Sequence, residues 1–385
     1  RGAARLLLDG RPCSPLGAAW AGAATLDSYD AHDGHALTKG HAGVVLLPAL
    51  LSLCDAGKRM SRGEFMTCLV MGYEVATRAG IALHATSPNY HCSGAWNALG
   101  VTAMACRVLA LSPRQIIEAL GIADYHAPRG LMMRGVDHPT MVKDGAGAGA
   151  LAGLQAALLA QSGFTGAPAE ILAGDEAPWN DLGGRWHVLE QYLKPYPVCR
   201  WAQPAIEAAV AVQAEHFISA GDIEGIVVET FHEATRLDHP APETTEQAQY
   251  SLPFPLAARL VHGDLGSGRI SGEGLRDAQV LRLAQRIRLN QNPVFNGSFP
   301  QRRFAQVTMR VKDGREFTSP VCEPRGEPSH PLDKQELMEK FMKLSEPVLG
   351  HRRGALAADV VAMWDSAEPI DGLLSSLLSP AGQGR

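Results

Sequence analysis

Hydrophobic positions recur at helical spacing over much of the first half of the chain, from about residue 43 to 165. In the segment GALAGLQAALLAQSG, three of them fall on one stripe: Leu151, Leu154 and Leu158. Gly163 follows where such a helix is expected to end. This part of the chain therefore predicts a largely helical domain.

A second segment, ALGVTAMACRVLALSPRQIIEALGIA, predicts two consecutive helices. Ser112 is a suitable N-cap for the second helix, with Pro113 at its first position and Gln115 three residues after the cap. Many of the residues on these helix faces are Ala and Gly, which predicts helices that pack closely against one another.

The pattern changes near residue 195, after KPYP. The segment DIEGIVVETF predicts a strand, and AQVTMRVKDGREFTS predicts a strand followed by a hairpin turn. Val307 and Met309 alternate with polar residues, and Asp313-Gly314 is a dipeptide typical of such turns. Strands therefore enter the prediction only in the second half.

Helical spacing returns at two places in the second half. One helix is predicted around residues 253 to 263. The segment LDKQELMEKFMKL predicts another, with Asp333 as its cap and Leu337, Phe341 and Leu344 on one face. The final SPAGQGR is expected to be disordered.

The elements together predict a mainly α protein with a smaller α+β domain. The 385 residues exceed what one hydrophobic core usually supports. We expect a helical domain over 1–192, an α+β domain over 193–328, and C-terminal helices over 329–385 that dock on the helical domain.

Composition narrows the class of partner. A net charge of −5 gives no electrostatic reason to expect nucleic acid or an anionic membrane as a partner. Pro48 interrupts the longest apolar run, which is too short to cross a bilayer. The seven cysteines include no C-x-x-C pair, which is typical of a reduced chain, so we expect a cytoplasmic protein.

The stretch DAHDGHALTKGH, residues 30–41, concentrates titratable groups just before an apolar segment. Three interpretations are open. Imidazoles and carboxylates could ligate zinc or iron, although their spacing fits no named metal motif. The stretch could be a polar loop that leads into a helix. It could also be part of a metal-free acid–base site. The candidate side chains are Asp30, His32, Asp33, His35 and His41.

Further cationic residues stand in loops that lead into predicted helices. His91 lies at the entry to one helix, Lys143 precedes a Gly/Ala-rich helix, and Lys194 and Arg200 lie at the predicted domain boundary. Helix N-termini add positive potential at such places. Each residue alone also has a purely structural explanation, and spacing does not show whether they converge.

Several segments resemble the MmgE/PrpD family, whose members include 2-methylcitrate dehydratase, cis-aconitate decarboxylase and iminodisuccinate epimerase. The resemblance runs from about residue 20 to 345, and the family's N-terminal helices are expected to be missing from this chain. It is carried by the segments TLDSYDAHDGHALTKGHAGVVLLPALL, YHCSGAWNALGVTAMACRVLALS, KDGAGAGALAGLQAALLAQSG, KPYPVCRWAQPAIEAA and YSLPFPLAARLVHG.

The resemblance implies a homodimer with a large helical domain, a smaller α+β domain and an active site between the two that uses no metal or cofactor. His41 matches the family's histidine just before the apolar run. The family's acidic residue falls on Asp30, but one residue is inserted before His41, so Asp33 or His35 could hold that position instead.

The resemblance also assigns residues farther along the chain. The family's second histidine falls on His91 and its two lysines on Lys143 and Lys194. Phe254 stands where the family often has tyrosine, and the missing hydroxyl argues against a decarboxylase. The segment DYHAPRGLMMRG differs from the well-known members, which predicts a different specificity set by His126, Arg129 and Arg134.

Family members act on small polycarboxylates at a carbon that loses or gains a proton. A base with a pKa near neutrality suits this step, so His91 is the expected base or acid and His41 its counterpart, with Asp30 orienting a histidine. Preorganised cations must stabilise the added negative charge. The expected cations are Lys143, Lys194, Arg200 and Arg129.

These residues predict a metal-independent carbon–oxygen lyase, a dehydratase of a small di- or tricarboxylate. The alternatives are an epimerase or isomerase, a decarboxylase, or a carboxylate-binding homologue without turnover. A thiol hydrolase that uses Cys92 beside His91 is a weaker hypothesis, because adjacent residues point in different directions. The segment GAGAGALAG is better explained by close helix packing than as a dinucleotide loop, since no strand precedes it.

Overall fold

Closely packed helices form the first part of the molecule in the computed structural model, which describes residues 3–174 and 176–380. A Cβ atom on Gly149 would lie only 2.9 Å from the Cα atom of Gly94, so the small residues allow this close approach, as predicted. The helices are α1 (Pro15–Tyr29), α2 (Gly43–Asp55), α3 (Arg62–Thr86), α4 (Gly94–Val108), α5 (Pro113–His126), α6 (Met132–Asp137), α7 (Ala146–Gln161) and α8 (Glu170–Ala173).

The helix α1 is absent from the sequence prediction, which begins the helical pattern at about residue 43. Its sequence PLGAAWAGAATLDSY has small residues on every side, so no apolar stripe stands out. Ser14 caps its start by accepting a hydrogen bond from the backbone of Gly17. Its end is set by Asp30, whose φ of 51° places it in the left-handed region. This cap positions the Asp30 side chain.

The predicted helix-capping residues are confirmed at the start of α5, after α7 and at the start of a C-terminal helix. Ser112 and Gln115 form a complete capping box at the start of α5. Gly163 follows α7 with a φ of +87°, which suits glycine. Asp333 forms a second capping box with Glu336 at the start of α15 (Lys334–Leu349).

A four-stranded mixed sheet, in the order β6-β5-β7-β8, is the centre of the second lobe. Its strands are β5 (Ile223–Thr230), β6 (Ile287–Gln291), β7 (Ala305–Val311) and β8 (Glu316–Thr318). Only β5 and β6 run parallel. The predicted alternation in β7 is confirmed, because Val307 and Met309 are buried and Arg310 is exposed. The strand β6 was not predicted.

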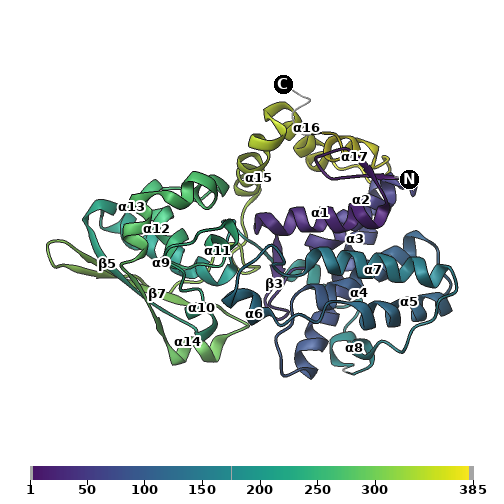
Figure 1. The fold of residues 1–385 in the computed structure, drawn as a ribbon, viewed down its shortest axis with the longest axis horizontal. Helices are drawn as coiled ribbons and strands as arrows, with labels where there is room; N and C mark the ends of the chain where they lie inside the picture. The colour runs from purple at the N-terminus through teal and green to yellow at the C-terminus, as the bar shows by residue number, and fades with distance from the viewer. Residues whose placement is uncertain (1–2, 175, 381–385) are drawn as a thin grey trace.

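Helices cover one face of this sheet (Figure 1). They are α9 (Gln203–Glu215), α12 (Pro253–His262) and α13 (Ala278–Ala284), while the shorter α10 (His232–Thr235), α11 (Thr245–Gln249) and α14 (Pro293–Ser298) lie in its connections. The helix predicted around 253 to 263 is thus confirmed. On the opposite face of β7, Thr308 and Arg310 are not buried, so the sheet packs on one side only.

The C-terminal helices lie above the helical lobe (Figure 1). They are α15, α16 (His351–Ala362) and α17 (Asp371–Leu377), and Ile370, Leu373 and Leu374 belong to the same hydrophobic core as the helices of the first half. Residues 381–385, most of the tail expected to be disordered, lie outside the described residues. The predicted fold class, mainly α with a smaller α+β part, is confirmed, and the three predicted domain boundaries stay predictions.

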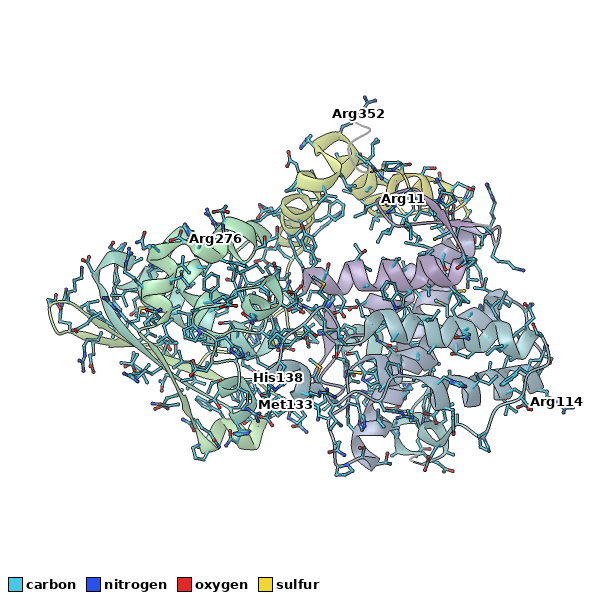
Figure 2. The ribbon with its side chains drawn as sticks, viewed as in Figure 1. Arg11, Arg114, Met133, His138, Arg276 and Arg352 are labelled. Carbon is cyan, nitrogen blue, oxygen red and sulfur yellow. The ribbon has the colours of Figure 1, made fainter. Side chains whose placement is uncertain are left out.

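Two short strands connect the lobes. β3 (Asp33–His35) pairs antiparallel with β4 (Gln191–Leu193), far away in the sequence. The helix α6 also lies at this junction, where Figure 2 labels Met133 and His138. Among the described residues, none of the helices combines the length and apolar character needed to cross a bilayer.

Candidate active site

The pairing of β3 with β4 brings two predicted site segments together. Asp33 is opposite Leu193 in the ladder, so the stretch 30–41 lies beside Lys194. A small cavity of about 30 Å³ opens there, which is room for one or two water molecules. Its charged and titratable lining residues are Asp30, Lys39, His41, Asp144, Lys194 and Arg200, and its large aromatic ones are Tyr90, Tyr192, Trp201 and Tyr250.

Asp30 and Lys194 line the cavity and form a charged cluster with Lys143, which lies beside Asp30 but does not line the cavity itself. The Oδ1 atom of Asp30 lies 3.1 Å from Nζ of Lys194 and 3.6 Å from Nζ of Lys143. Burial opposes ionisation of Asp30, but these two cations and His32 outweigh it and hold its pKa well below the usual range. One carboxylate therefore faces two lysine side chains, and burial lowers the pKa of Lys194 while the charge of Asp30 raises it.

Among the described residues, Asp30 and Lys194 both have side-chain atoms that form no hydrogen bond. Among the described residues, the second carboxylate oxygen of Asp30 accepts no hydrogen bond, and Nζ of Lys194 donates none despite its short ion-pair distance. Lys194 is 0% exposed. A buried ammonium group without hydrogen bonds is costly to keep, so this arrangement is suited to completion by a ligand.

His41 is held in a defined tautomer. Its Nδ1 atom is hydrogen-bonded to the backbone carbonyl oxygen of Asp33, which can only accept, so Nδ1 carries the proton and Nε2 the lone pair. Burial and the neighbouring His32, whose ring centroid lies 4.1 Å away, hold the pKa of His41 well below its usual range. The imidazole is therefore neutral at neutral pH with its lone pair at Nε2, but its lowered pKa makes it a weaker base than the histidine with a pKa near neutrality that the sequence predicted.

Asp144 supplies a second titratable group to the cavity that the sequence analysis did not single out. Burial and the nearby Asp27 raise the pKa of Asp144 to about 7. Ser93 connects it to His41, because the backbone N–H and the hydroxyl of Ser93 contact the carboxyl of Asp144 while the Ser93 oxygen accepts from the backbone N–H of His41 at 2.9 Å. A neutral base and a carboxyl group that titrates near pH 7 thus line the same cavity.

Tyr250, not residue 254, brings a tyrosine hydroxyl to the site. Phe254 is fully buried in the core of the second lobe and is not among the cavity-lining residues. Tyr250 lines the cavity, and Nζ of Lys143 lies 5.1 Å from its ring centroid. Phe254 is therefore not placed with the lysines, and the effect of its missing hydroxyl on the reaction stays a prediction.

Lys143 and Arg200 are both held by other residues. Lys143 donates to the side-chain oxygen of Gln249 at 2.5 Å, and Gln249 in turn donates to the backbone of Ser28 at the end of α1. Arg200 lines the cavity but forms an ion pair of 2.8 Å with Glu327. Its charge is already compensated, so Arg200 has less free positive charge than the lysine pair.

Three predicted residues lie away from the cavity. The backbone of His91 forms an isolated antiparallel β-bridge with Leu131. His91 does not line the cavity, although its neighbour Tyr90 does. Burial and Arg129 lower the pKa of His91. Arg129 is ion-paired with Asp124, and His126 is exposed at the end of α5. Their roles in catalysis and specificity stay predictions.

Three candidate residues of the stretch do not line the cavity, and one of them, His32, has its Nε2 atom 3.3 Å from the carboxylate of Asp27. Asp33 accepts a hydrogen bond from the hydroxyl of Tyr73, and burial raises its pKa. His35 is buried, with Nε2 lying 3.4 Å from Glu190. Neither lines the cavity. Of the two acidic residues considered for the family's position, only Asp30 is placed with the lysines.

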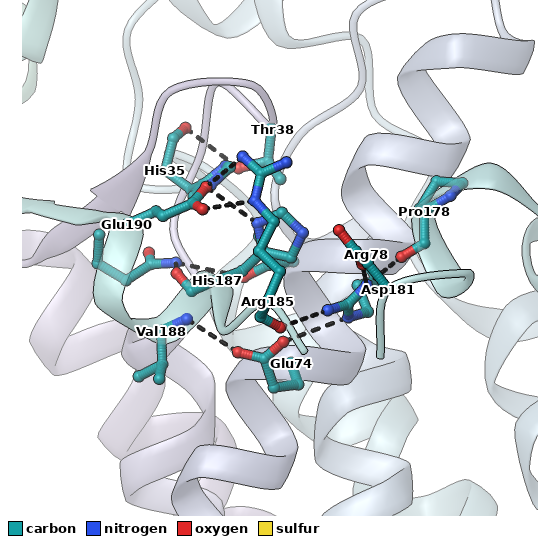
Figure 3. A network of polar contacts seen from close by, with 12 residues as sticks. His35, Thr38, Glu74, Arg78, Pro178, Asp181, Arg185, His187, Val188 and Glu190 are labelled. Carbon is teal, nitrogen blue, oxygen red and sulfur yellow. Dashed lines mark hydrogen bonds and ion pairs between the residues drawn. The ribbon is translucent and has the colours of Figure 1, made fainter. Parts of the chain in front are cut away.

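His35 belongs instead to what we name the Arg78 network (Figure 3), formed by Glu74, Arg78, Asp181, Arg185, His187, Glu190 and His35. Arg78 is 0% exposed and donates to Glu74, Asp181 and two backbone carbonyls. The backbone of Val188 donates to Glu74 at 2.9 Å. The network therefore ties the segment before Lys194 to α3.

Part of this network has the composition of a metal site. Ligand atoms of His35, His187 and Glu190 all lie within 4.8 Å of one another. However, Arg185 forms two hydrogen bonds with the Glu190 carboxylate, at 2.6 and 2.9 Å. The guanidinium supplies the positive charge that a cation would bring to Glu190, whereas Nδ1 of His35 has no hydrogen-bond partner among the described residues.

Cys92 has the surroundings of a core thiol. It is 6% exposed, and burial raises its pKa to about 11. A nucleophilic cysteine needs a lowered pKa, which is the opposite of what is found. The weaker hypothesis of a thiol hydrolase is therefore not supported.

The C-terminal helix α15 also reaches this region. Nζ of Lys340 donates to the backbone carbonyl of Ala31 at 2.7 Å, directly beside Asp30. Burial and the charge of Lys194 lower the pKa of Lys340 to about 8. The loop that carries Asp30 is thus fixed from both sides, by α1 and by α15.

Comparison with known proteins agrees with this architecture. The MmgE/PrpD N-terminal domain matches residues 1–183, and the MmgE/PrpD C-terminal domain matches residues 196–366. A cis-aconitate decarboxylase from Aspergillus terreus is 23% identical over 98% of this chain and 84% of its own length. The mouse and human cis-aconitate decarboxylases are 24% and 25% identical, over 97% and 94% of this chain and 81% and 76% of their own lengths.

Proposed function

The chain belongs to the MmgE/PrpD family, and we propose that it is a lyase for a small di- or tricarboxylate, acting through negative charge that develops next to a carboxylate. The observation that carries the proposal is that a neutral histidine lines the same cavity as Asp30 and Lys194, with Lys143 directly behind Asp30. Such a cluster is the metal-free means of stabilising a developing carbanion.

Dehydration is the first candidate reaction. His41 would take the proton on the carbon α to a carboxylate through Nε2. The electron pair then extends onto that carboxylate, where Lys143, Lys194 and the hydroxyl of Tyr250 would donate hydrogen bonds. The carbon–oxygen bond breaks next, and the departing hydroxide takes a proton and leaves as water. Asp144 is suited to give that proton, because its pKa of about 7 keeps a large part of it protonated near neutrality.

Decarboxylation is the second candidate, favoured by the names of the relatives and by the presence of Tyr250 in the cavity. In that reaction a carbon–carbon bond to a carboxylate breaks, carbon dioxide leaves, and the electron pair remains on carbon. The same lysines would stabilise the pair until a proton is added. Asp144 or Tyr250 would supply the proton.

Binding requires the cavity to enlarge. Its volume of about 30 Å³ is too small for a molecule with two or three carboxylates. The cavity is bounded by elements from both lobes, including Asp30 of the first and Trp201 and Tyr250 of the second. We therefore propose that the described form is a closed one, and that the lobes separate to admit substrate and exclude water when they close again.

Proton NMR in D₂O tests the proposal directly. The enzyme would be incubated with 2-methylcitrate, citrate, cis-aconitate, tartrates and iminodisuccinate, with and without a chelator. A dehydratase loses the α proton together with the hydroxyl and forms an alkene, whereas a decarboxylase releases carbon dioxide and gains one deuterium. Lys143→Ala should lower the rate, and Lys58→Ala, an exposed lysine outside the cavity, should not.

Three results would contradict the proposal in different ways. Loss of activity with the chelator would show that a metal takes part. Epimerisation without loss of water or carbon dioxide would replace the lyase by an isomerase. Binding of a polycarboxylate without turnover would identify a carboxylate-binding homologue. The homodimer expected from the family resemblance also stays a prediction, which light scattering of the purified protein measures.

A further inference from the structure

Lys39 is the one residue of the stretch 30–41 with a cation in the cavity that the proposed reaction does not use. It lines the cavity, and its ammonium nitrogen lies 4.6 Å from the ring centroid of Tyr90. Within the described residues it has no ion pair within 4.0 Å and no side-chain hydrogen bond; burial lowers its pKa, and the charge of Glu233 raises it in part. Its charge is therefore available to a ligand, unlike that of Arg200.

The backbone at Lys39 is strained. Its φ of 53° lies in the left-handed region, where glycine and asparagine are preferred and lysine is disfavoured by roughly 1 kcal/mol. The adjacent residue is Gly40, so the chain already uses glycine in this turn. Strain of this kind persists where the side chain has a function and the surroundings enforce the conformation.

The surroundings do enforce it. The hydroxyl of Tyr90 donates to the carbonyl oxygen of Lys39, and the Lys39 N–H donates to the carbonyl of Ala36 at 3.2 Å. The same Ala36 oxygen accepts from Nη2 of Arg303 at 3.2 Å. Both ends of the turn are thus held by side chains, one of which also lines the cavity.

Arg303 is itself unusual. It is 2% exposed, and within the described residues no carboxylate lies within 4.0 Å of its guanidinium and no acceptor contacts its Nε atom. Its guanidinium carbon lies 5.7 Å from the ring centroid of Tyr192, which lines the cavity. A buried guanidinium without an acid is costly to retain, and it adds positive potential to the side of the cavity that holds Lys39.

We infer that Lys39, supported by Arg303, binds a second carboxylate of the substrate. This inference rests on the proposed function, because it divides the carboxylates of one substrate between two groups of cations. Lys143 and Lys194 take the carboxylate next to the reacting carbon. Lys39 takes the other, so the enzyme selects molecules with at least two carboxylates.

Matched four-carbon ligands test this selection by isothermal titration calorimetry. Maleate has two carboxylates in cis, whereas in cis-crotonate (isocrotonate, called crotonate below) a methyl group replaces one of them. Lys39→Gly should weaken maleate binding by roughly 10- to 100-fold, the range expected for a lost hydrogen bond to a charged group. Crotonate binding should stay within about twofold of the wild type. The same variant relieves the positive φ and should not lower the melting temperature.

Two further variants complete the design. Ala110→Gly relieves a similar φ of 53° at an exposed residue after α4 and should leave both affinities unchanged. Arg303→Met keeps the volume of a buried side chain but removes its charge, and should also weaken maleate more than crotonate. Unchanged maleate affinity in Lys39→Gly would overturn the inference, as would an equal loss for both ligands.

The failure of this inference differs from the failure of the proposed function. Turnover of a polycarboxylate by NMR together with a Lys39→Gly variant of unchanged maleate affinity would keep the lyase and remove the second subsite. Maleate binding that depends on Lys39 without turnover of any acid would keep the subsite and remove the lyase. No binding of maleate to the wild-type protein would overturn the subsite, and the NMR panel would then decide the lyase separately.

Discussion

Two buried clusters of charge, both built in part from residues 30–41, differ in how completely their atoms are paired. In the Arg78 network, the guanidinium of Arg78 donates four hydrogen bonds, and Glu190 accepts two from Arg185 (Figure 3). In the cavity, Asp30 shares one oxygen between two lysines while its other oxygen and Nζ of Lys194 have no hydrogen bond among the described residues. Similar residue types therefore serve opposite purposes.

The difference teaches how to separate structural from functional charge in a buried site. A satisfied network contributes to stability, and its loss leaves a partner charge uncompensated. An incompletely satisfied cluster beside a cavity costs stability and is retained for a ligand. Variants in the Arg78 network should therefore lose mainly stability, whereas variants in the cavity cluster should lose mainly activity.

His41→Gln should lower kcat/KM by about 10²- to 10⁴-fold, because it removes the general base while keeping a side chain of similar size. Its melting temperature should change little. Steady-state rates on the substrate found by NMR, together with a thermal melt, measure both. His351→Gln, an exposed histidine on α16, is the matched control. A rate within tenfold of wild type would remove His41 from the mechanism.

Arg78→Met should reduce the free energy of unfolding by about 3–5 kcal/mol, since it leaves the buried carboxylate of Glu74 without its cation. Urea denaturation measures the loss. The folded fraction should retain activity within a few-fold of the wild type, because Arg78 does not line the cavity. If activity fell more than stability, the contrast between the two clusters would be wrong.

Lys194→Met should show the reverse behaviour, with kcat/KM lower by about 10²- to 10³-fold, as found when one preorganised donor to a developing oxyanion is removed. Asp30 would keep Lys143 as its ion-pair partner, so the loss of unfolding free energy should be smaller than in Arg78→Met. Parallel urea titrations of Lys194→Met and Arg78→Met measure this difference in unfolding free energy. Equal destabilisation with normal rates would assign Lys194 a structural role.

Asp144→Asn should change how stability depends on pH. Burial and Asp27 raise the pKa of Asp144 to about 7, above its value in the unfolded chain, so the folded state holds the proton more tightly. This contribution to stability is present below about pH 4 and is lost as the pH rises through 7. The variant lacks that loss, so its melting temperature relative to wild type should rise between pH 5 and 8. A constant or falling difference would contradict the assignment.

Part of the site could be predicted because its residues lie in recognisable local sequence segments. Asp30, His41, Lys143 and Lys194 stand in recognisable segments, and the structure places all four together. His91 was expected with them but lies outside the cavity lining. Asp144 adjoins Lys143 in the segment KDG, and Lys39 is in the stretch first singled out, but neither position carried a role in the sequence.

The sequence by itself determined the local elements. The capping boxes at Ser112 and Asp333 and the alternation in β7 depend on neighbouring residues, and these predictions are confirmed. The resemblance over most of the chain likewise indicated the family before any contact was known. Local hydrogen bonds and periodic burial depend on consecutive residues, so the sequence alone determines them.

Only the tertiary structure decided which groups share the cavity and how each one titrates. Tyr250 enters it while Phe254 packs in the core, and His35 joins a different network through a ladder formed with residues about 155 positions later. The pKa of Asp144 is raised because water is excluded and Asp27 is near, and neither condition can be read from spacing. Desolvation and convergence arise from packing between distant segments, so they exist only in the folded molecule.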